Sequence, residues 1–124
     1  MNELITIHLI VGFTAALPAI LMRFVNTEKP NMWFGYRTPG SLKSEHTWKF
    51  ANEYSAKAMV WVAISTILTQ IFLYFTLENF EGQILISSGV MTIGIIMVLA
   101  LTESKISNLF DKDGKPKNPE ADKF

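Results

Sequence analysis

Three long apolar runs limit what this chain can fold into. They cover residues 4–22, 58–77 and 84–101. At 1.5 Å per residue, a helix of about 20 residues is about 30 Å long, which matches the hydrocarbon thickness of a bilayer. A backbone that crosses lipid must satisfy its own hydrogen bonds, so each run is predicted to form one membrane-spanning helix. The predicted fold class is therefore all-α, a three-helix transmembrane bundle.

The composition favours a membrane protein with a single domain. The chain has 124 residues, of which 49% are hydrophobic and 18% charged, and its formal net charge is zero. Because the charges balance, direct nucleic-acid binding is not expected. The chain has no cysteine, which excludes disulfides and thiolate chemistry. A cleaved signal peptide is disfavoured for the first run, since no basic residue precedes it and the run is long for such a segment.

Basic side chains gather on one side of the predicted spans. Six of the eleven Lys and Arg residues lie in the loop region 23–57 and five follow the third run, whereas the N-terminus and the connector 78–83 have none. Cytoplasmic loops of membrane proteins carry an excess of Lys and Arg. The sequence therefore predicts that the N-terminus is outside, the C-terminus is cytoplasmic, and the loop 23–57 is cytoplasmic.

The cytoplasmic loop contains a turn followed by a helix start. The segment 37–40, Arg-Thr-Pro-Gly, has the residues that favour a turn. Ser44 is predicted to cap the next helix, with Glu45 placed favourably in its first turn. Because no Gly or Pro interrupts residues 44–77, they are predicted to form one helix of about 34 residues. The first third of this helix is expected to project from the membrane as a cytoplasmic helical extension of the second span.

Two polar residues inside the spans are candidates for function. His8 lies one turn into the first run, where a neutral imidazole that reaches water or headgroups is the simpler interpretation, and a proton relay or metal ligand is the alternative. Gln70 lies in the second run, and its amide is expected to hydrogen-bond within the bundle or, alternatively, to contact a substrate. Neither interpretation requires a cofactor, and no metal site is predicted.

The basic loop offers chemistry for binding anions. Arg37 presents a planar fork that suits phosphate or carboxylate, with Asn31 and Thr38 as neutral donors and Lys43 and Lys49 as nearby charges. This set fits membrane lipid headgroups or an acidic partner surface. The alternative is structural, in which Arg37 ties the loop to helix-end carbonyls and to Asn52. No catalytic residues are predicted, because the sequence has no nucleophile–base spacing, metal cluster or phosphate-binding glycine loop.

The same stretch resembles a known family. The matching positions are Asn31, Gly35, Arg37, Thr38, Pro39, Leu42, Glu45, Trp48 and Asn52, and they resemble the motif of the SdpI family of small multi-pass bacterial membrane proteins. The three-span layout of residues 1–105 is also similar to the family's membrane domain. One departure is Ala56, which stands where a glycine is common. From the motif and the charges together, the candidate binding residues are Asn31, Gly35, Tyr36, Arg37, Thr38, Lys43, Trp48 and Asn52.

The resemblance implies a location and a role. It implies a non-enzymatic protein of the bacterial cell inner membrane that acts in toxin immunity or signal transduction. The founding member protects its cell against a peptide toxin and is thought to hold a transcription repressor at the membrane, so these are the partners to expect besides membrane lipids. The alternative is a small transporter or channel subunit that works as a homo-oligomer, because three helices enclose little pore.

The last part of the chain is predicted to be a flexible tail. Residues 106–124 are polar, and the segment 111–119 is rich in Pro, Gly and charged residues. Such a composition supplies little apolar surface to bury, so disorder is expected there.

Overall fold

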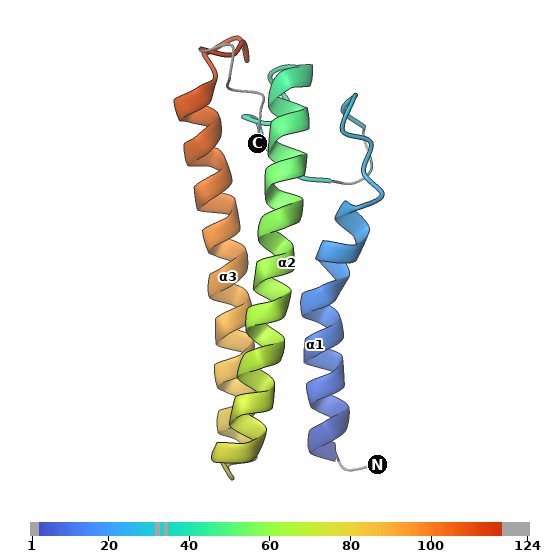
Figure 1. The fold of residues 1–124 in the computed structure, drawn as a ribbon, viewed down its shortest axis with the longest axis vertical. Helices are drawn as coiled ribbons and strands as arrows, with labels where there is room; N and C mark the ends of the chain where they lie inside the picture. Colours follow the sequence, from blue (N-terminus) through green and yellow to red (C-terminus); the bar gives the residue numbers. More distant parts are fainter. Residues whose placement is uncertain (1–2, 32, 34, 118–124) are drawn as a thin grey trace.

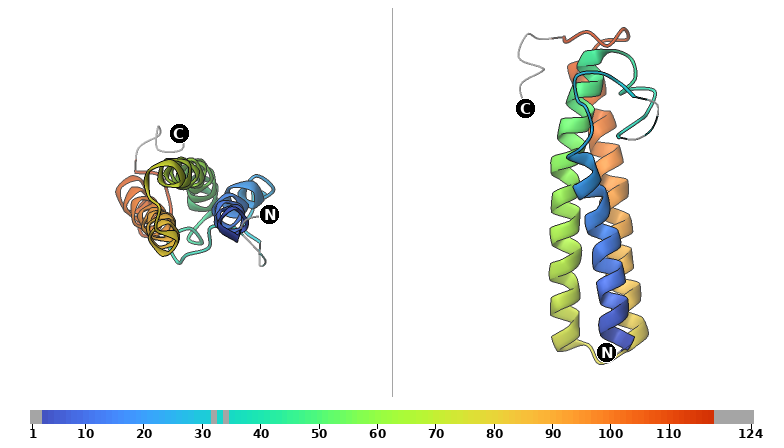
Figure 2. Two further views of the ribbon diagram at one scale, coloured as in Figure 1. Left: turned by 90° about the horizontal axis from the view of Figure 1, so that it is seen from below. Right: turned by 90° about the vertical axis from the view of Figure 1, so that its right-hand side faces the viewer.

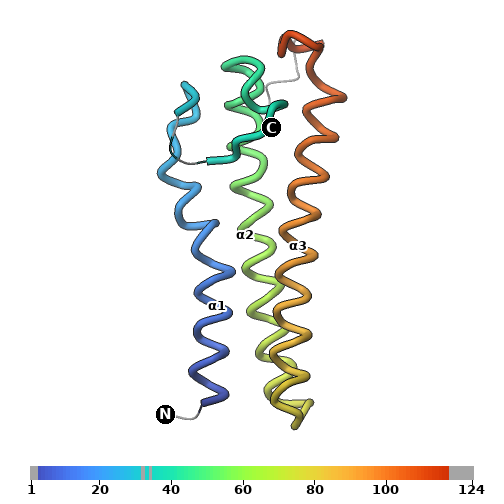
Figure 3. Tube along the Cα trace, turned by 180° about the vertical axis from the view of Figure 1, so that it is seen from behind, coloured from blue at the N-terminus to red at the C-terminus, as the bar shows by residue number. Residues whose placement is uncertain are grey.

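Three helices form the bundle. The computed structural model describes residues 3–31, 33 and 35–117. It contains α1 (Glu3–Met22), α2 (Glu45–Thr76) and α3 (Phe80–Leu109), which run side by side in Figures 1 and 3. The loop between α1 and α2 lies at the same end of the bundle as the end of α3, and the short α2–α3 connection lies at the other end. The predicted all-α fold with three helices is confirmed.

The central helix is α2. It contacts both other helices, whereas α1 and α3 make far fewer contacts with each other. The view along the bundle in the left part of Figure 2 shows the same order, with α2 between its neighbours. A close approach marks the α2–α3 interface, because a Cβ built on Gly94 would lie 3.0 Å from a side-chain carbon of Val62. Gly94 thus allows close packing, whereas Gly89 has open space beside it.

The start of α2 is fixed by a capping box. Ser44 is the N-cap, and its hydroxyl oxygen accepts a hydrogen bond from the backbone N–H of Thr47 at 3.1 Å. In return, the Thr47 hydroxyl accepts from the backbone N–H of Ser44 at 3.0 Å. The predicted cap at Ser44 is confirmed, and one unbroken helix of 32 residues follows it. The projection of its first third from the membrane stays a prediction.

The α2–α3 connection is shorter than the predicted connector 78–83. It comprises residues 77–79, because Asn79 already caps α3. The Asn79 side-chain oxygen accepts a hydrogen bond from the backbone N–H of Gly82 at 2.6 Å. An asparagine at this position satisfies one of the free N–H groups of the first helical turn, so the helix starts before the apolar run does.

The outer surface of the bundle is apolar. All three helices are long and apolar enough to cross a membrane. Within the most apolar 18-residue stretch of each helix, only 11% of α1, 28% of α2 and 11% of α3 is buried inside the protein. The apolar side chains therefore face outward, which is favourable in lipid and unfavourable in water. The predicted spans 4–22 and 84–101 lie within α1 and α3, and the span 58–77 ends one residue after α2.

The structure differs from the predicted flexible tail over residues 106–117. The third helix continues to Leu109, and the next residue, Phe110, is only 3% exposed. Its ring packs against that of Phe50 on α2, with centroids 5.7 Å apart. A polar composition concealed this aromatic contact, which helps to hold the segment against α2. Residues 118–124 of the predicted tail lie outside the described residues.

A tight turn follows Phe110 and covers the start of α2. The Asp111 carboxylate accepts hydrogen bonds from the backbone N–H groups of Asp113 and Lys115, both at 2.9 Å. The bond from Lys115 is the main cause of a pKa of Asp111 below its usual value. Gly114 has φ of +80°, and its carbonyl accepts a hydrogen bond from the Ser44 hydroxyl at 2.6 Å. The end of the described chain thus contributes to the capping site of α2.

We predict that Phe110→Ala destabilises the protein. Loss of a buried aromatic ring typically costs about 3–5 kcal/mol, because a cavity remains. The measurement is thermal unfolding in detergent, where the Tm of the variant is expected to fall by several degrees. Phe24→Ala is the matched control, since the Phe24 side chain is 74% exposed. A Tm equal to that of the wild type for both variants would show that the segment after α3 does not pack.

Candidate functional site

The loop between α1 and α2, here called the motif loop (residues 23–44), is tied to α2 by Trp48. The Trp48 side chain is fully buried, and its indole N–H donates a hydrogen bond to the Asn26 carbonyl at 2.8 Å. Val25 is also buried, beside Trp48 and Gly35. Trp48 therefore has a structural role, because the indole N–H, its only polar side-chain group, holds the start of the loop.

Asn52 holds the middle of the motif loop. Its side-chain oxygen accepts a hydrogen bond from the backbone N–H of Tyr36 at 2.7 Å, and its amide group donates to the Trp48 carbonyl at 3.0 Å. Gly35 is required next to this bond, because its φ is +118° and a Cβ there would lie 2.8 Å from the Asn52 oxygen. Three of the predicted site residues, Gly35, Trp48 and Asn52, therefore form one packed unit.

The predicted turn at residues 37–40 is stabilised by Ser41. The Ser41 hydroxyl is buried and accepts a hydrogen bond from the Thr38 backbone N–H at 2.8 Å. The Thr38 hydroxyl accepts in return from the Ser41 backbone N–H at 3.1 Å. The Leu42 N–H donates to the Thr38 carbonyl at 3.1 Å. These bonds satisfy the backbone of a tight turn that packs on the helices.

Glu103 on α3 also holds the motif loop by hydrogen bonds. Its carboxylate oxygen accepts hydrogen bonds from the Tyr36 hydroxyl at 2.8 Å and from the Thr38 hydroxyl. Burial, and then the neighbouring Glu103 carboxylate, raises the pKa of Tyr36 above its usual value, so the phenol stays a neutral donor at physiological pH. Since Asn52 belongs to α2 and Glu103 to α3, residues 35–38 connect the two helices.

The cationic site residues lie apart from this packed unit. Arg37 and Lys43 are exposed, and within the described part of the chain neither makes a hydrogen bond or an ion pair. Lys49 approaches Glu28 at 3.9 Å, with both side chains largely exposed. The structural alternative for Arg37 is therefore not supported, because Tyr36 makes the contact with Asn52 that was considered for it.

Asn31 has a local role. Its side-chain oxygen accepts a hydrogen bond from the backbone N–H of Trp33 at 2.9 Å, which stabilises a local bend of the loop. The structure thus separates the predicted site residues into a packed set, which comprises Gly35, Tyr36, Thr38, Trp48 and Asn52, and an outer set, which comprises Arg37 and Lys43.

Sequence reasoning missed Glu103 and Ser41. Glu103 is the first charged residue after the third apolar run, and an ionisable residue at the edge of a span is a signal for a specific partner. That signal does not identify Tyr36 and Thr38 as the partners, because they lie 67 and 65 residues away in the chain. Ser41 gave no signal beyond its place after a predicted turn.

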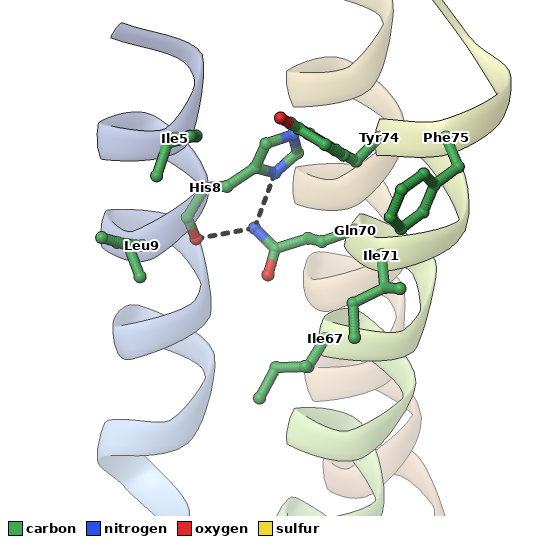
Figure 4. A pocket seen from close by; sticks show the side chains of 8 residues that line it. All are labelled: Ile5, His8, Leu9, Ile67, Gln70, Ile71, Tyr74 and Phe75. Carbon is green, nitrogen blue, oxygen red and sulfur yellow. Dashed lines mark hydrogen bonds between the residues drawn. The ribbon is translucent and has the colours of Figure 1, made fainter. Parts of the chain in front are cut away.

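The opposite end of the bundle contains a polar cluster in which His8 does not reach outward. Its ring nitrogens contact Gln83 at 2.8 Å and Gln70 at 3.1 Å, so both candidate polar residues of the spans meet in one network. Figure 4 shows His8 and Gln70 facing each other between α1 and α2. The prediction that the Gln70 amide bonds within the bundle is confirmed.

The comparisons with known proteins give one match. The model of the SdpI/YfhL protein family matches residues 27–102, which is more than half of the chain and includes the motif loop from residue 27, α2 and most of α3. No curated protein and no solved structure matches the chain.

We predict that Gly35→Ala destabilises the motif loop. A positive φ costs a residue with a Cβ about 1–2 kcal/mol, and the new Cβ would also push against Asn52. Thermal unfolding should show a lower Tm, and the indole N–H resonance of Trp48 should shift because the loop no longer fits.

Gly89→Ala is the matched control. It also adds one methyl group, but a Cβ at Gly89 meets no atom within 4 Å. Equal Tm values for the two variants would contradict the close packing of Gly35 on Asn52.

Proposed function

The chain belongs to the SdpI/YfhL family, and from this premise we propose that it is a non-enzymatic membrane protein whose motif loop binds an anionic group at the cytoplasmic membrane surface. One observation carries the proposal. Arg37 is exposed and unpaired within the described residues, while its neighbours Tyr36 and Thr38 are held by α2 and α3. A guanidinium on a fixed backbone is ready to receive a bidentate anion with little loss of entropy.

Lipid headgroups are the favoured source of the anion. Among its described residues, the motif loop exposes two aromatic side chains, Phe24 at 74% and Trp33 at 88%, together with Arg37 and Lys43. Aromatic rings and basic groups that flank a membrane span are typical of the headgroup region. An acidic surface of a partner protein offers the same chemistry, and the experiment below separates the two.

A binding role also fits the state of the polar groups in the loop. Tyr36, Thr38 and Glu103 bond to one another, and Asn52 bonds to the backbone, so these groups are engaged in holding the loop. We infer that they support the surface that Arg37 and Lys43 present, and that they do not carry out a reaction. In the family context this surface is proposed to serve toxin immunity or signalling, with a peptide toxin or a transcription repressor as partner.

The proposed location is the bacterial inner membrane, with the motif loop inside. Residues 1–22 and 58–104 contain no Lys or Arg, so the ten basic residues that the structure describes lie in or beside the segments at the motif-loop end. The positive-inside rule then supports an external N-terminus and a cytoplasmic C-terminus.

We predict that single cysteines report this orientation, since the chain has none of its own. Glu81→Cys should react with a membrane-impermeant thiol reagent in intact cells, because Glu81 is exposed in the first turn of α3. Lys112→Cys, exposed at the other end, should react only after the cells are opened. The reverse pattern would overturn the orientation.

We predict that Arg37→Lys keeps the fold and weakens anion binding. The chain has two arginines, Arg23 and Arg37, so a protein labelled with ¹⁵N-arginine gives two side-chain Nε signals, and the variant identifies one of them. Phosphatidylglycerol added to zwitterionic nanodiscs should shift the Arg37 signal. A lysine cannot form paired hydrogen bonds with one anion. The variant should therefore need several times more anionic lipid than the wild type to reach the same shift of the other motif-loop resonances.

The controls separate lipid from protein partners. Lys112→Gln removes an exposed charge at the same end of the bundle but outside the motif loop, and it should leave the titration unchanged. A soluble acidic peptide is titrated in parallel. A shift with the peptide and none with the lipid would assign the anion to a partner protein. No shift with either, or a lower Tm for Arg37→Lys, would contradict the proposal.

A further inference from the structure

The polar cluster at the end opposite the motif loop joins all three helices. The Gln70 amide on α2 donates to the His8 carbonyl at 2.8 Å and to the His8 Nδ1 atom at 3.1 Å. The other ring nitrogen, Nε2, donates to the Gln83 side-chain oxygen on α3 at 2.8 Å. The Gln83 amide donates to the Leu77 carbonyl. These directions are mutually consistent for a neutral imidazole with its hydrogen on Nε2.

One acceptor of this cluster has no partner. Both Gln70 donor contacts use its amide nitrogen, so its side-chain oxygen makes no hydrogen bond within the described residues, although Gln70 is only 7% exposed. Gly12 leaves space beside that oxygen, since a Cβ built there would lie 3.1 Å from it. In Figure 4 the oxygen points into the space between α1 and α2, near Ile67. This oxygen is not among the fully buried unpaired polar atoms of the described residues, so it remains accessible from the space beside it.

The space beside Gln70 is a crevice of about 250 Å³. Its walls are mostly apolar, and the residues that line it are Ile5, His8, Leu9, Ile67, Gln70, Ile71, Tyr74 and Phe75. A cavity of ~150 Å³ already accepts a benzene ring, so this crevice has room for a short alkyl chain or an aromatic ring. It opens sideways between α1 and α2.

A second hollow of about 400 Å³ adjoins the crevice and opens at the end of the bundle. The two hollows share Tyr74 and Phe75, and the second is also lined by Glu78 and Gln83. Glu78 is exposed in the α2–α3 connection, and no Lys or Arg occurs in residues 1–22 or 58–104 to neutralise it. Exposed aromatic rings next to an uncompensated carboxylate are the groups that recognise an organic cation.

We propose that this end of the bundle binds a cationic amphiphile, with its apolar chain in the crevice between α1 and α2 and its ammonium head at Glu78 beside Tyr74 and Phe75. The site is independent of the motif loop, because it lies at the other end of the three helices.

The side-chain amide signals of two glutamines can report binding at this site. Gln70 and Gln83 are the only glutamines of the chain, so ¹⁵N-glutamine labelling gives two side-chain amide pairs. The full chain in micelles of dodecyl maltoside, a neutral detergent, is titrated with decyltrimethylammonium. The Gln70 amide is expected to shift in a saturable way. The neutral probe 1-decanol, with the same chain length, should bind several times more weakly.

Paired variants test each half of the site. Glu78→Gln should weaken decyltrimethylammonium binding roughly fivefold, whereas Glu81→Gln, an exposed acid at the same end that lines neither hollow, should not. Ile67→Trp fills the crevice and should abolish the shift. Ile64→Trp is its control, because Ile64 is 41% exposed against 39% for Ile67 and lies outside the crevice.

The proposal has clear contrary results. Equal binding of the cationic and neutral probes would show a non-selective apolar surface and overturn it. Equal effects of Glu78→Gln and Glu81→Gln would remove Glu78 as the head-group site. If Ile67→Trp misfolds, the Gln83 side-chain amide signals will move before any probe is added, because the contact of Gln83 with His8 is lost. Leu9→Trp then replaces Ile67→Trp as the crevice-filling variant. A saturable shift that survives both crevice-filling variants would also overturn the proposal.

Discussion

The hydrogen bonds of Asn52 are the constraint on which the motif end of this protein depends. One side chain, 1% exposed, accepts from the Tyr36 backbone and donates to the Trp48 carbonyl. An amide buried in this way is costly unless both of its ends are paired, so the loop must bring its backbone to this depth. Gly35 makes the approach feasible. The exposure of Arg37 follows, because its neighbours on the chain are the residues that point inward.

Glu103 turns this local clamp into a connection between helices. In lipid, apolar helices gain little from burying apolar surface against each other, and polar contacts and close packing contribute more to their association. The carboxylate accepts hydrogen bonds from the Tyr36 and Thr38 hydroxyls of the motif loop. Phe110, which follows α3, packs on Phe50 of α2. The α2–α3 pair is thus held at the motif end by a polar contact and an aromatic contact together.

The sequence predicted the features that depend on near neighbours. The three spans follow from hydropathy, and the Ser44 cap follows from the residues around it. Contacts between distant residues were not predictable from one sequence. Glu103 and His8 were visible as polar residues at the edges of apolar runs, but their partners were not. Residues 106–117 were expected to be flexible because they are mostly polar. The burial of Phe110, which depends on residues distant in the chain, could not be read from that composition.

The first helix shows why polar contacts at both ends matter. It contacts α3 little and packs mainly on α2. Lipid can replace apolar packing between membrane helices, so polar contacts contribute most to its position. Its position is therefore set at one end by the Gln70–His8 bonds and at the other by the Trp48–Asn26 bond in the loop that follows it. A ligand that changes the Gln70 amide acts on one of these two attachments.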